Sequence, residues 1–76
     1  MNIIIVALVD YAIDDKYHPY YTDNVYVGTK ERDAFEKLQN WNKDKAIEII
    51  RKYQFWQNGI LIHTQEVEHF QKNLNK

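Results

Sequence analysis

The strongest constraint on the fold is a nearly continuous apolar stretch from Asn2 to Ile13, rich in β-branched residues. A half-exposed strand alternates apolar and polar residues, whereas a strand covered on both faces is apolar throughout. One face would carry Ile3, Ile5, Ala7, Val9, Tyr11 and Ile13, and the other Ile4, Val6 and Leu8 before it turns polar at Asp10. The stretch therefore predicts a central strand of a sheet.

The length of 76 residues predicts a single domain spanning residues 1–76, because a chain this short has too little apolar surface for two cores. The chain has no cysteine, so apolar packing must hold it together, alone or with another chain. The absence of cysteine is consistent with a reducing compartment. The apolar run Ile3–Val9 is far shorter than the roughly 20 residues of a membrane-spanning helix and lacks the flanks of a signal peptide. We therefore expect a cytoplasmic protein that does not bind a membrane.

The charge balance also narrows the partners. Ten Lys and Arg residues against eleven Asp and Glu residues give a formal net charge of -1. This charge supplies neither the basic field that a phosphate backbone attracts nor the dense negative charge of a DNA mimic. Nucleic acid is therefore a disfavoured partner.

A loop and a second strand should follow the first strand. Residues 14–24, DDKYHPYYTDN, hold the only proline and several Asp and Asn residues, which is typical of a loop. Val25–Val27 resumes an extended pattern, and we expect it to pair antiparallel with the first strand.

A helix should then run from about Lys30 to Trp41. Thr29 could cap it with its hydroxyl group, and acidic residues follow in the first turn. The apolar stripe of this helix would consist of Ala34, Phe35, Leu38 and Trp41, which recur at helical spacing. We expect all four to face the sheet.

The segment from Lys43 to Tyr53 has two possible interpretations. Its apolar residues would form a second helical stripe, but Asn58-Gly59 is a strong signal for a type I′ hairpin turn. Such a turn sets a register that pairs Trp56 with Leu61, Phe55 with Ile62, Arg51 with Glu66, Ile50 with Val67, Glu48 with His69, and Ile47 with Phe70. These pairs match in chemistry, so we favour a hairpin. The fold class is then α+β, a four-stranded antiparallel sheet with one helix in ββαββ order, with a two-helix alternative left open.

Two strings in this chain, VYVGTKERDAFEKLQNW and FWQNGILIH, resemble segments of small accessory proteins of bacteriophages and mobile elements. Those proteins share a strand ending in a small turn, an amphipathic helix and a W-x-x-G hairpin. The resemblance covers roughly Val25 to His63 and rests on architectural motifs. It implies a viral or mobile-element setting in a bacterial host, and it carries over no functional residue.

Catalytic motifs are sparse in this sequence. There is no Ser, no Cys and only two Gly residues, which excludes serine and thiolate nucleophiles and a glycine-rich phosphate loop. Acid–base or metal-assisted chemistry could use a cluster around the first loop, made of Asp10, Asp14, Asp15, His18 and Asp23. Its spacing fits no known calcium loop or histidine-carboxylate triad, and acidic loops are usually solvated turns. We therefore expect no enzyme activity, no catalytic or metal-binding residues and no cofactor.

Two histidines on the last strand, His63 and His69, could suggest metal ligation as a pair. Six residues along a strand separate them by roughly 20 Å, which is too far for a shared ion. We expect each to be a surface or cross-strand partner.

The first loop holds the candidate partner-binding residues. They are Tyr17, His18, Tyr20 and Tyr21, with Asp14 and Asp15 as a polar rim. Tyr11 and Tyr26 are expected to pack against the sheet, but the loop aromatics are too crowded for all of them to be buried. Exposed tyrosines are typical of protein-binding hot spots. Stacking on nucleic-acid bases is disfavoured because positive charge is missing around them.

These observations favour a non-enzymatic protein-interaction module, plausible as a phage-encoded inhibitor of a bacterial host or defence protein. The alternative is a protein that sequesters a small ligand or nucleotide signal, and the third candidate is a small metal-dependent enzyme. A homodimer or higher homo-oligomer is also expected, because the first strand is apolar on both faces and one helix covers only one of them.

Overall fold

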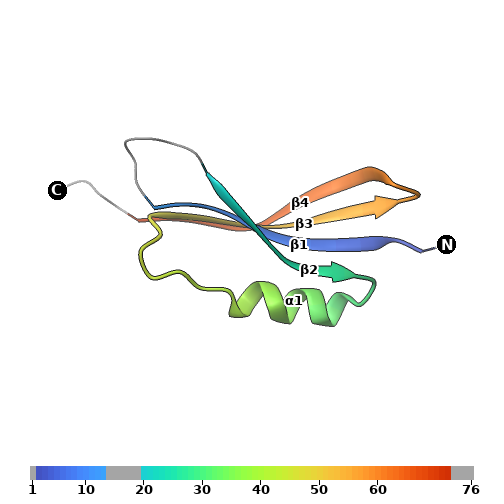
Figure 1. Cartoon of the computed structure of the whole chain (residues 1–76), viewed down its shortest axis with the longest axis horizontal. Coiled ribbons are helices and arrows are strands. Elements are labelled where there is room, and N and C mark those ends of the chain that lie inside the picture. The colour runs from blue at the N-terminus through green and yellow to red at the C-terminus, as the bar shows by residue number, and fades with distance from the viewer. Residues whose placement is uncertain (1, 14–19, 73–76) are drawn as a thin grey trace.

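The computed structural model describes residues 2–13 and 20–72, which form one four-stranded antiparallel sheet and one helix (Figure 1). The elements are β1 (Ile4–Ala12), β2 (Tyr21–Gly28), α1 (Glu31–Asn40), β3 (Glu48–Gln57) and β4 (Ile60–Gln71). The strands lie in the spatial order β2-β1-β3-β4. The predicted α+β class and ββαββ order are confirmed.

The predicted central position of β1 is confirmed, since β1 pairs antiparallel with β2 on one side and with β3 on the other. Ile5, Ala7, Val9 and Tyr11 form the core of the domain together with the helix. Leu8, on the opposite face, is also buried, at 6% exposure. The middle of that face is therefore buried without a second layer.

Helix α1 packs against β1 and β2 through its smallest and its most apolar side chains. Ala34 and Leu38 are fully buried against the odd-numbered residues of β1. Phe35, which was expected in the same stripe, is 53% exposed. The prediction was wrong because Phe35 lies about 100° further around the helix than Ala34, so it points along the sheet rather than into it.

The expected cap at Thr29 is also wrong. The N-cap position belongs to Lys30, whose side chain makes no capping hydrogen bond. Instead, the backbone N–H of Lys30 donates to the hydroxyl oxygen of Tyr26 at 3.0 Å. Tyr26, at the end of β2, therefore satisfies a donor at the helix N-terminus, where backbone N–H groups lack intrahelical partners.

The hairpin interpretation of the C-terminal half is confirmed, and the two-helix alternative is wrong. Residues 48–57 form β3, and β4 follows after a two-residue turn. Asn58 has φ of 54° and Gly59 has φ of 77°. Positive φ at both central residues is the geometry of a type I′ turn.

The predicted register of this hairpin holds only next to the turn. Trp56 pairs with Leu61, but Phe55 then pairs with His63, and Arg51 pairs with Glu68. The expected ladder pairs Phe55–Ile62, Arg51–Glu66, Ile50–Val67, Glu48–His69 and Ile47–Phe70 are therefore wrong. Two irregularities, between Phe55 and Trp56 and between Arg51 and Lys52, each shift the ladder by one residue of β4. A turn fixes the first pairs only, because each bulge adds an unpaired residue to one strand.

The helix leaves much of the sheet uncovered. Figure 1 shows α1 running along β2 and β1, whereas β3 and β4 continue the sheet on the side of β1 away from the helix. All twelve residues of β4 are exposed. In the part of the chain that the structure describes, no helix is long and apolar enough to cross a membrane.

Candidate functional site

Four of the six predicted partner-binding residues, Asp14, Asp15, Tyr17 and His18, lie outside the described residues. Of the other two, Tyr21 is the first residue of β2 and Tyr20 directly precedes it, and both are about half exposed. They are adjacent in the chain but take part in contacts on opposite faces of the sheet.

Tyr21 belongs to the helix face. It pairs with Tyr11, and the two rings stack with centroids 5.4 Å apart. Tyr11 in turn contacts Trp41 at 5.1 Å. The expected packing of Tyr11 and Tyr26 against the sheet is confirmed, since both belong to or contact the core. Tyr21 is thus a partly exposed member of an aromatic stack.

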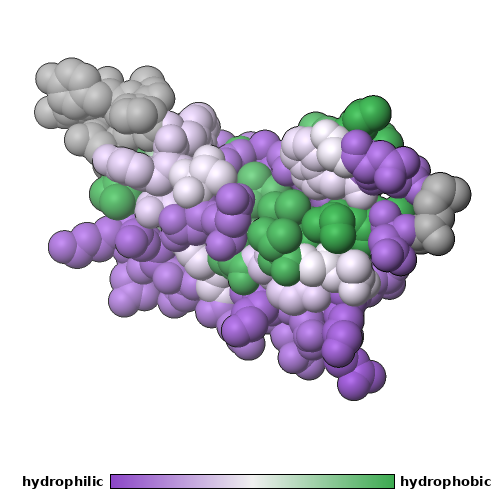
Figure 2. Space-filling view, turned by 45° about the vertical axis from the view of Figure 1, so that its right-hand side comes forward, coloured by the Kyte–Doolittle hydropathy of each residue, from purple (hydrophilic) through white to green (hydrophobic). Residues whose placement is uncertain are grey.

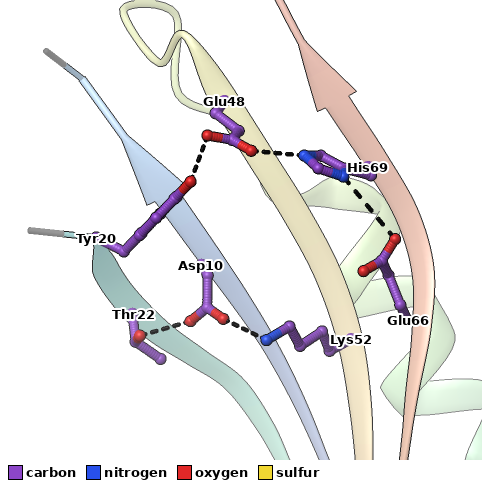
Figure 3. Close-up of polar contacts among 7 residues, drawn as sticks. All are labelled: Asp10, Tyr20, Thr22, Glu48, Lys52, Glu66 and His69. Atoms are coloured by element: carbon purple, nitrogen blue, oxygen red, sulfur yellow. Dashed lines mark hydrogen bonds and ion pairs between the residues drawn. The ribbon is translucent and has the colours of Figure 1, made fainter. Parts of the chain in front are cut away.

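Tyr20 belongs to a polar network on the face that the helix leaves open (Figure 3). Its hydroxyl donates to Glu48 Oε1 at 2.5 Å, and Nε2 of His69 lies 2.6 Å from Glu48 Oε2. Nδ1 of the same imidazole lies 4.0 Å from a carboxylate oxygen of Glu66. The network therefore runs from the start of β2 across β3 to β4.

A second group of contacts lies beside the first. The hydroxyl of Thr22 donates to Asp10 Oδ1 at 2.6 Å, and Lys52 Nζ lies 2.7 Å from Oδ2 of the same carboxylate. Partial burial of Asp10 opposes its charged form, but the hydrogen bonds from Lys52 and Thr22, together with the lysine charge, outweigh it and lower the Asp10 pKa. The Asp10 carboxylate is therefore stabilised as an anion by groups of the protein itself.

The contacts of this network link neighbouring strands and do not form a reactive site. Hydrogen bonding to Glu48 raises the pKa of Tyr20, which keeps its hydroxyl protonated. A protonated phenol that donates to a carboxylate is neither a base nor a nucleophile. Among the described residues, no group of three metal-ligating side chains could hold a metal ion.

The acidic cluster expected around the first loop is divided in the structure. Asp10 points to the open face, whereas Asp23 pairs with Val9 and accepts a hydrogen bond from Trp41 Nε1 at 3.0 Å on the helix face. These two carboxylates therefore do not belong to one site, and the other members of the cluster, Asp14, Asp15 and His18, lie outside the described residues.

The two histidines are cross-strand partners, as predicted. His63 stacks on Phe55 with ring centroids 5.8 Å apart, and His69 contacts Glu48. The contact between His69 and Glu48 forms although the two residues are not ladder partners, because side chains on the same face also reach diagonal neighbours.

An apolar groove lies on the helix face, beside the exposed ring of Phe35. It lies between the flank of α1 and the adjoining part of β3, and we call it the aromatic groove. Its lining consists of Ile5, Glu31, Ala34, Phe35, Tyr53, Phe55 and Gln65, and its volume is about 340 Å³. A neighbouring hollow of about 410 Å³ shares Ile5, Glu31 and Phe55 with it. Figure 2 shows hydrophobic side chains gathered in the middle of one face of the molecule, with hydrophilic side chains around them.

The electrostatics of the aromatic groove come from one acidic side chain. Glu31 is the first residue of α1 and lines both hollows. Burial raises the pKa of Tyr53, and the nearby charge of Glu31 raises it further. No lysine or arginine is among the described residues that line either hollow. The groove is therefore aromatic and carries negative charge.

The aromatic groove was not predicted from the sequence. Tyr53 and Phe55 are two residues apart in a strand, so their placement on one face could have been predicted from the hairpin. The exposure of Phe35 could not, because a helical stripe does not show how far across a sheet the helix sits. Comparison with known proteins adds no further residue: no family model matches the chain, and no curated protein or solved structure is significantly similar to it.

Proposed function

We propose that this chain is a non-enzymatic protein-interaction module that binds its partner through the aromatic groove. The observation that carries the proposal is that α1 packs on β1 and β2 and leaves a groove in which the partly buried rings of Tyr53 and Phe55 lie beside the exposed ring of Phe35. Aromatic side chains in a concave, partly desolvated position are the usual anchors of protein interfaces.

The setting of this interaction follows from the resemblance of residues 25–63 to accessory proteins of phages and mobile elements. We extend the proposal accordingly to inhibition of a bacterial host or defence protein in the cytoplasm. Binding by shape requires no cofactor.

The loop tyrosines and the aromatic groove are separate candidate surfaces. Tyr21 lies beside Tyr11 at one end of β1, whereas the groove lies beside Ile5 near the other end. Six residues of strand separate these ends by roughly 20 Å. A large interface could include both surfaces, and substitutions in each would show which one the partner contacts.

The size of the aromatic groove also supports the second candidate function, which is sequestration of a small ligand or nucleotide signal. Small-molecule sites are apolar clefts of about 300 to 1,000 Å³ with a few polar groups, and this groove falls at the lower end of that range. A ligand that binds only the folded state would raise the melting temperature.

The experiment that tests the main proposal is affinity capture from a lysate of the host bacterium, with the tagged chain and two variants. Phe35→Ser removes a groove ring that is 53% exposed, and the matched control Phe70→Ser removes a β4 ring that is 46% exposed and lies outside the groove. We expect Phe35→Ser to lose the captured protein and Phe70→Ser to retain it. Equal capture by both variants would contradict the proposal.

We also propose that a second copy of the chain covers part of the open face. At one end of that face an apolar patch crosses all four strands. It consists of Ile4, Val6, Val27, Trp56 and Leu61, in which Ile4 pairs with Trp56, Val6 with Val27 and Trp56 with Leu61. Val27 is 64% exposed, Leu61 42% and Ile4 36%. Exposed apolar patches of this kind are typical of oligomer interfaces.

A further inference from the structure

We propose that the aromatic groove binds an arginine side chain of the partner protein, whose guanidinium group would pair with Glu31 between the rings of Phe35, Tyr53 and Phe55. The inference rests on the proposed function and specifies what the partner must present at this surface.

The charge of the aromatic groove favours a cationic ligand. Glu31 lines the aromatic groove, and among the described residues it takes part in no ion pair. The rest of the described lining is neutral. Glu31 is exposed, so its carboxylate is accessible to a cation at the opening of the groove. The groove therefore selects for positive charge and against an acidic or phosphorylated group.

The arrangement of the rings in the groove also favours a cationic ligand. The centroids of Tyr53 and Phe55 are 6.2 Å apart, with an angle of 48° between the ring planes, and Phe35 lines the same hollow from the helix. The negative face of an aromatic ring attracts a cation that lies within about 6 Å of its centroid. Tilted rings around one hollow offer such faces from more than one direction.

The chemistry of the guanidinium group favours arginine over lysine in this groove. A guanidinium group is planar, stacks on rings and is more weakly hydrated than an ammonium group, so it loses less hydration on entry into an apolar groove. It also offers several N–H donors, one pair of which can meet the Glu31 carboxylate. The side-chain oxygen of Gln65, which also lines the groove, is a second acceptor for the remaining N–H groups.

The fold already holds one of its own arginines by the same kinds of contact. The guanidinium carbon of Arg51 lies 5.7 Å from the centroid of the Trp41 ring. Its Nε lies 3.5 Å from a carboxylate oxygen of Glu68, and its Nη2 donates to the Trp41 carbonyl oxygen at 3.0 Å. The aromatic groove offers a ring, a carboxylate and a carbonyl-type oxygen of the same kinds, but no arginine of the described chain lines it.

The test is a titration of the whole chain with Nα-acetyl-arginine amide. The NMR resonances of the groove rings are measured at each step of the titration. The matched probe is Nα-acetyl-citrulline amide, which has the same shape but no charge. We expect the arginine probe to shift the resonances of Phe35, Tyr53 and Phe55, and the citrulline probe to leave them unchanged. In Glu31→Gln the affinity for the arginine probe should fall by about tenfold, since a charge-assisted hydrogen bond is lost.

The control variant is Glu36→Gln, which removes an exposed carboxylate of the same helix that does not line the groove. It should bind the arginine probe as the unmodified chain does. Melting curves of both variants will show that each one is folded. Equal shifts with the two probes, or unchanged affinity in Glu31→Gln, would overturn the arginine assignment.

The titration and the capture experiment test the arginine inference and the proposed function separately. If Phe35→Ser abolishes partner capture but the arginine probe does not bind, the interaction module stands and the arginine inference is wrong. If Phe35→Ser leaves capture unchanged, the proposed function is wrong whatever the probe does. Tetramethylammonium serves as a third probe, and binding as tight as that of the arginine probe would show that the groove selects a cation without hydrogen-bond donors, which also overturns the inference.

Discussion

The carboxylate of Asp10 lies 2.7 Å from the ammonium nitrogen of Lys52, although these two residues are not ladder partners. Asp10 pairs with Ile50, and Lys52 pairs with Leu8, so the ion pair crosses diagonally between β1 and β3. The same carboxylate accepts a hydrogen bond from Thr22 of β2. One side chain therefore links three strands on the face that α1 leaves open (Figure 3).

We predict that Asp10→Asn destabilises the domain in a pH-dependent manner. The folded state lowers the Asp10 pKa below its ordinary value of 3.8. The stabilising contribution of this carboxylate is therefore fully present above pH 3.8 and is lost as the pH falls through the lower pKa of the folded state. The difference in the free energy of unfolding should be about 1 kcal/mol near neutral pH and should shrink on acidification.

Urea denaturation of the unmodified chain and of Asp10→Asn, over a range of pH from neutral to acidic, measures this difference. Asp44→Asn is the control, because the hydrogen bond that Asp44 accepts among the described residues comes from the Asn42 amide in the loop before β3. It should cost less stability near neutral pH than Asp10→Asn does. A difference for Asp10→Asn that grows on acidification would contradict the prediction.

We predict that Tyr26→Phe weakens the start of α1. The phenol oxygen of Tyr26 accepts the backbone N–H of Lys30, and loss of an N-terminal partner of this kind costs about 1 kcal/mol. Thr29→Ala, which removes the side chain expected to cap the helix from sequence, should cost less. Thermal denaturation of the two variants compares them, and a larger loss for Thr29→Ala would show that the threonine is the effective cap.

The position of Gly28 predicts a second route to the same effect. A Cβ atom at this residue would collide with the ring and hydroxyl of Tyr26. Gly28→Ala should therefore displace the Tyr26 side chain and destabilise the domain at least as much as Tyr26→Phe does. In the double variant the combined loss should be smaller than the sum of the two, because the hydrogen bond to Lys30 is lost only once, and thermal denaturation measures it.

We predict that Gly59→Val destabilises the fold by about 1 kcal/mol or more through backbone strain. Gly59 has φ of 77°, and nothing lies within 4 Å of the position that a Cβ atom would take. The cost should therefore come from conformation and not from collision. Gly59→Asn is the matched control, since asparagine tolerates positive φ. If both variants have the same melting temperature as the unmodified chain, the prediction of strain at the turn is wrong.

We predict that the chain is a homodimer or larger assembly in solution at tens of micromolar protein, and that the apolar patch of the open face forms the contact. Light scattering after size exclusion should give a multiple of the chain mass. Leu61→Lys, within the patch, should give the mass of one chain. Ile60→Lys changes an exposed neighbour on the opposite face and should keep the assembly. A monomeric mass for the unmodified chain would contradict the prediction.

The sequence predicts the register of the last hairpin next to its turn but not further along its strands. Asn58-Gly59 was sufficient to predict β3, β4 and the pair Trp56–Leu61, because turn geometry and the first pairs are local. The bulges further along shift Arg51 to Glu68. They depend on how a long, exposed strand twists along its neighbour, and no local residue pattern marks them.

For the candidate site, the sequence likewise predicts the kind of surface but not its position. Residue types alone excluded serine and thiolate nucleophiles and predicted an aromatic interaction surface. The sequence could not place that surface, because the two described loop tyrosines contact opposite faces of the sheet, and the rings around the groove come from α1 and β3.

The sequence by itself determined that β1 is central, that one amphipathic helix packs on the sheet and that a type I′ turn joins the last two strands, since periodicity and turn chemistry are local properties. Only the tertiary structure decided that α1 lies over β1 and β2, with Phe35 at its open flank. That offset follows from close packing of Ala34 and Leu38 on Val9 and its neighbours. Helical periodicity shows which residues of α1 face the sheet, but it does not show which strands they pack on.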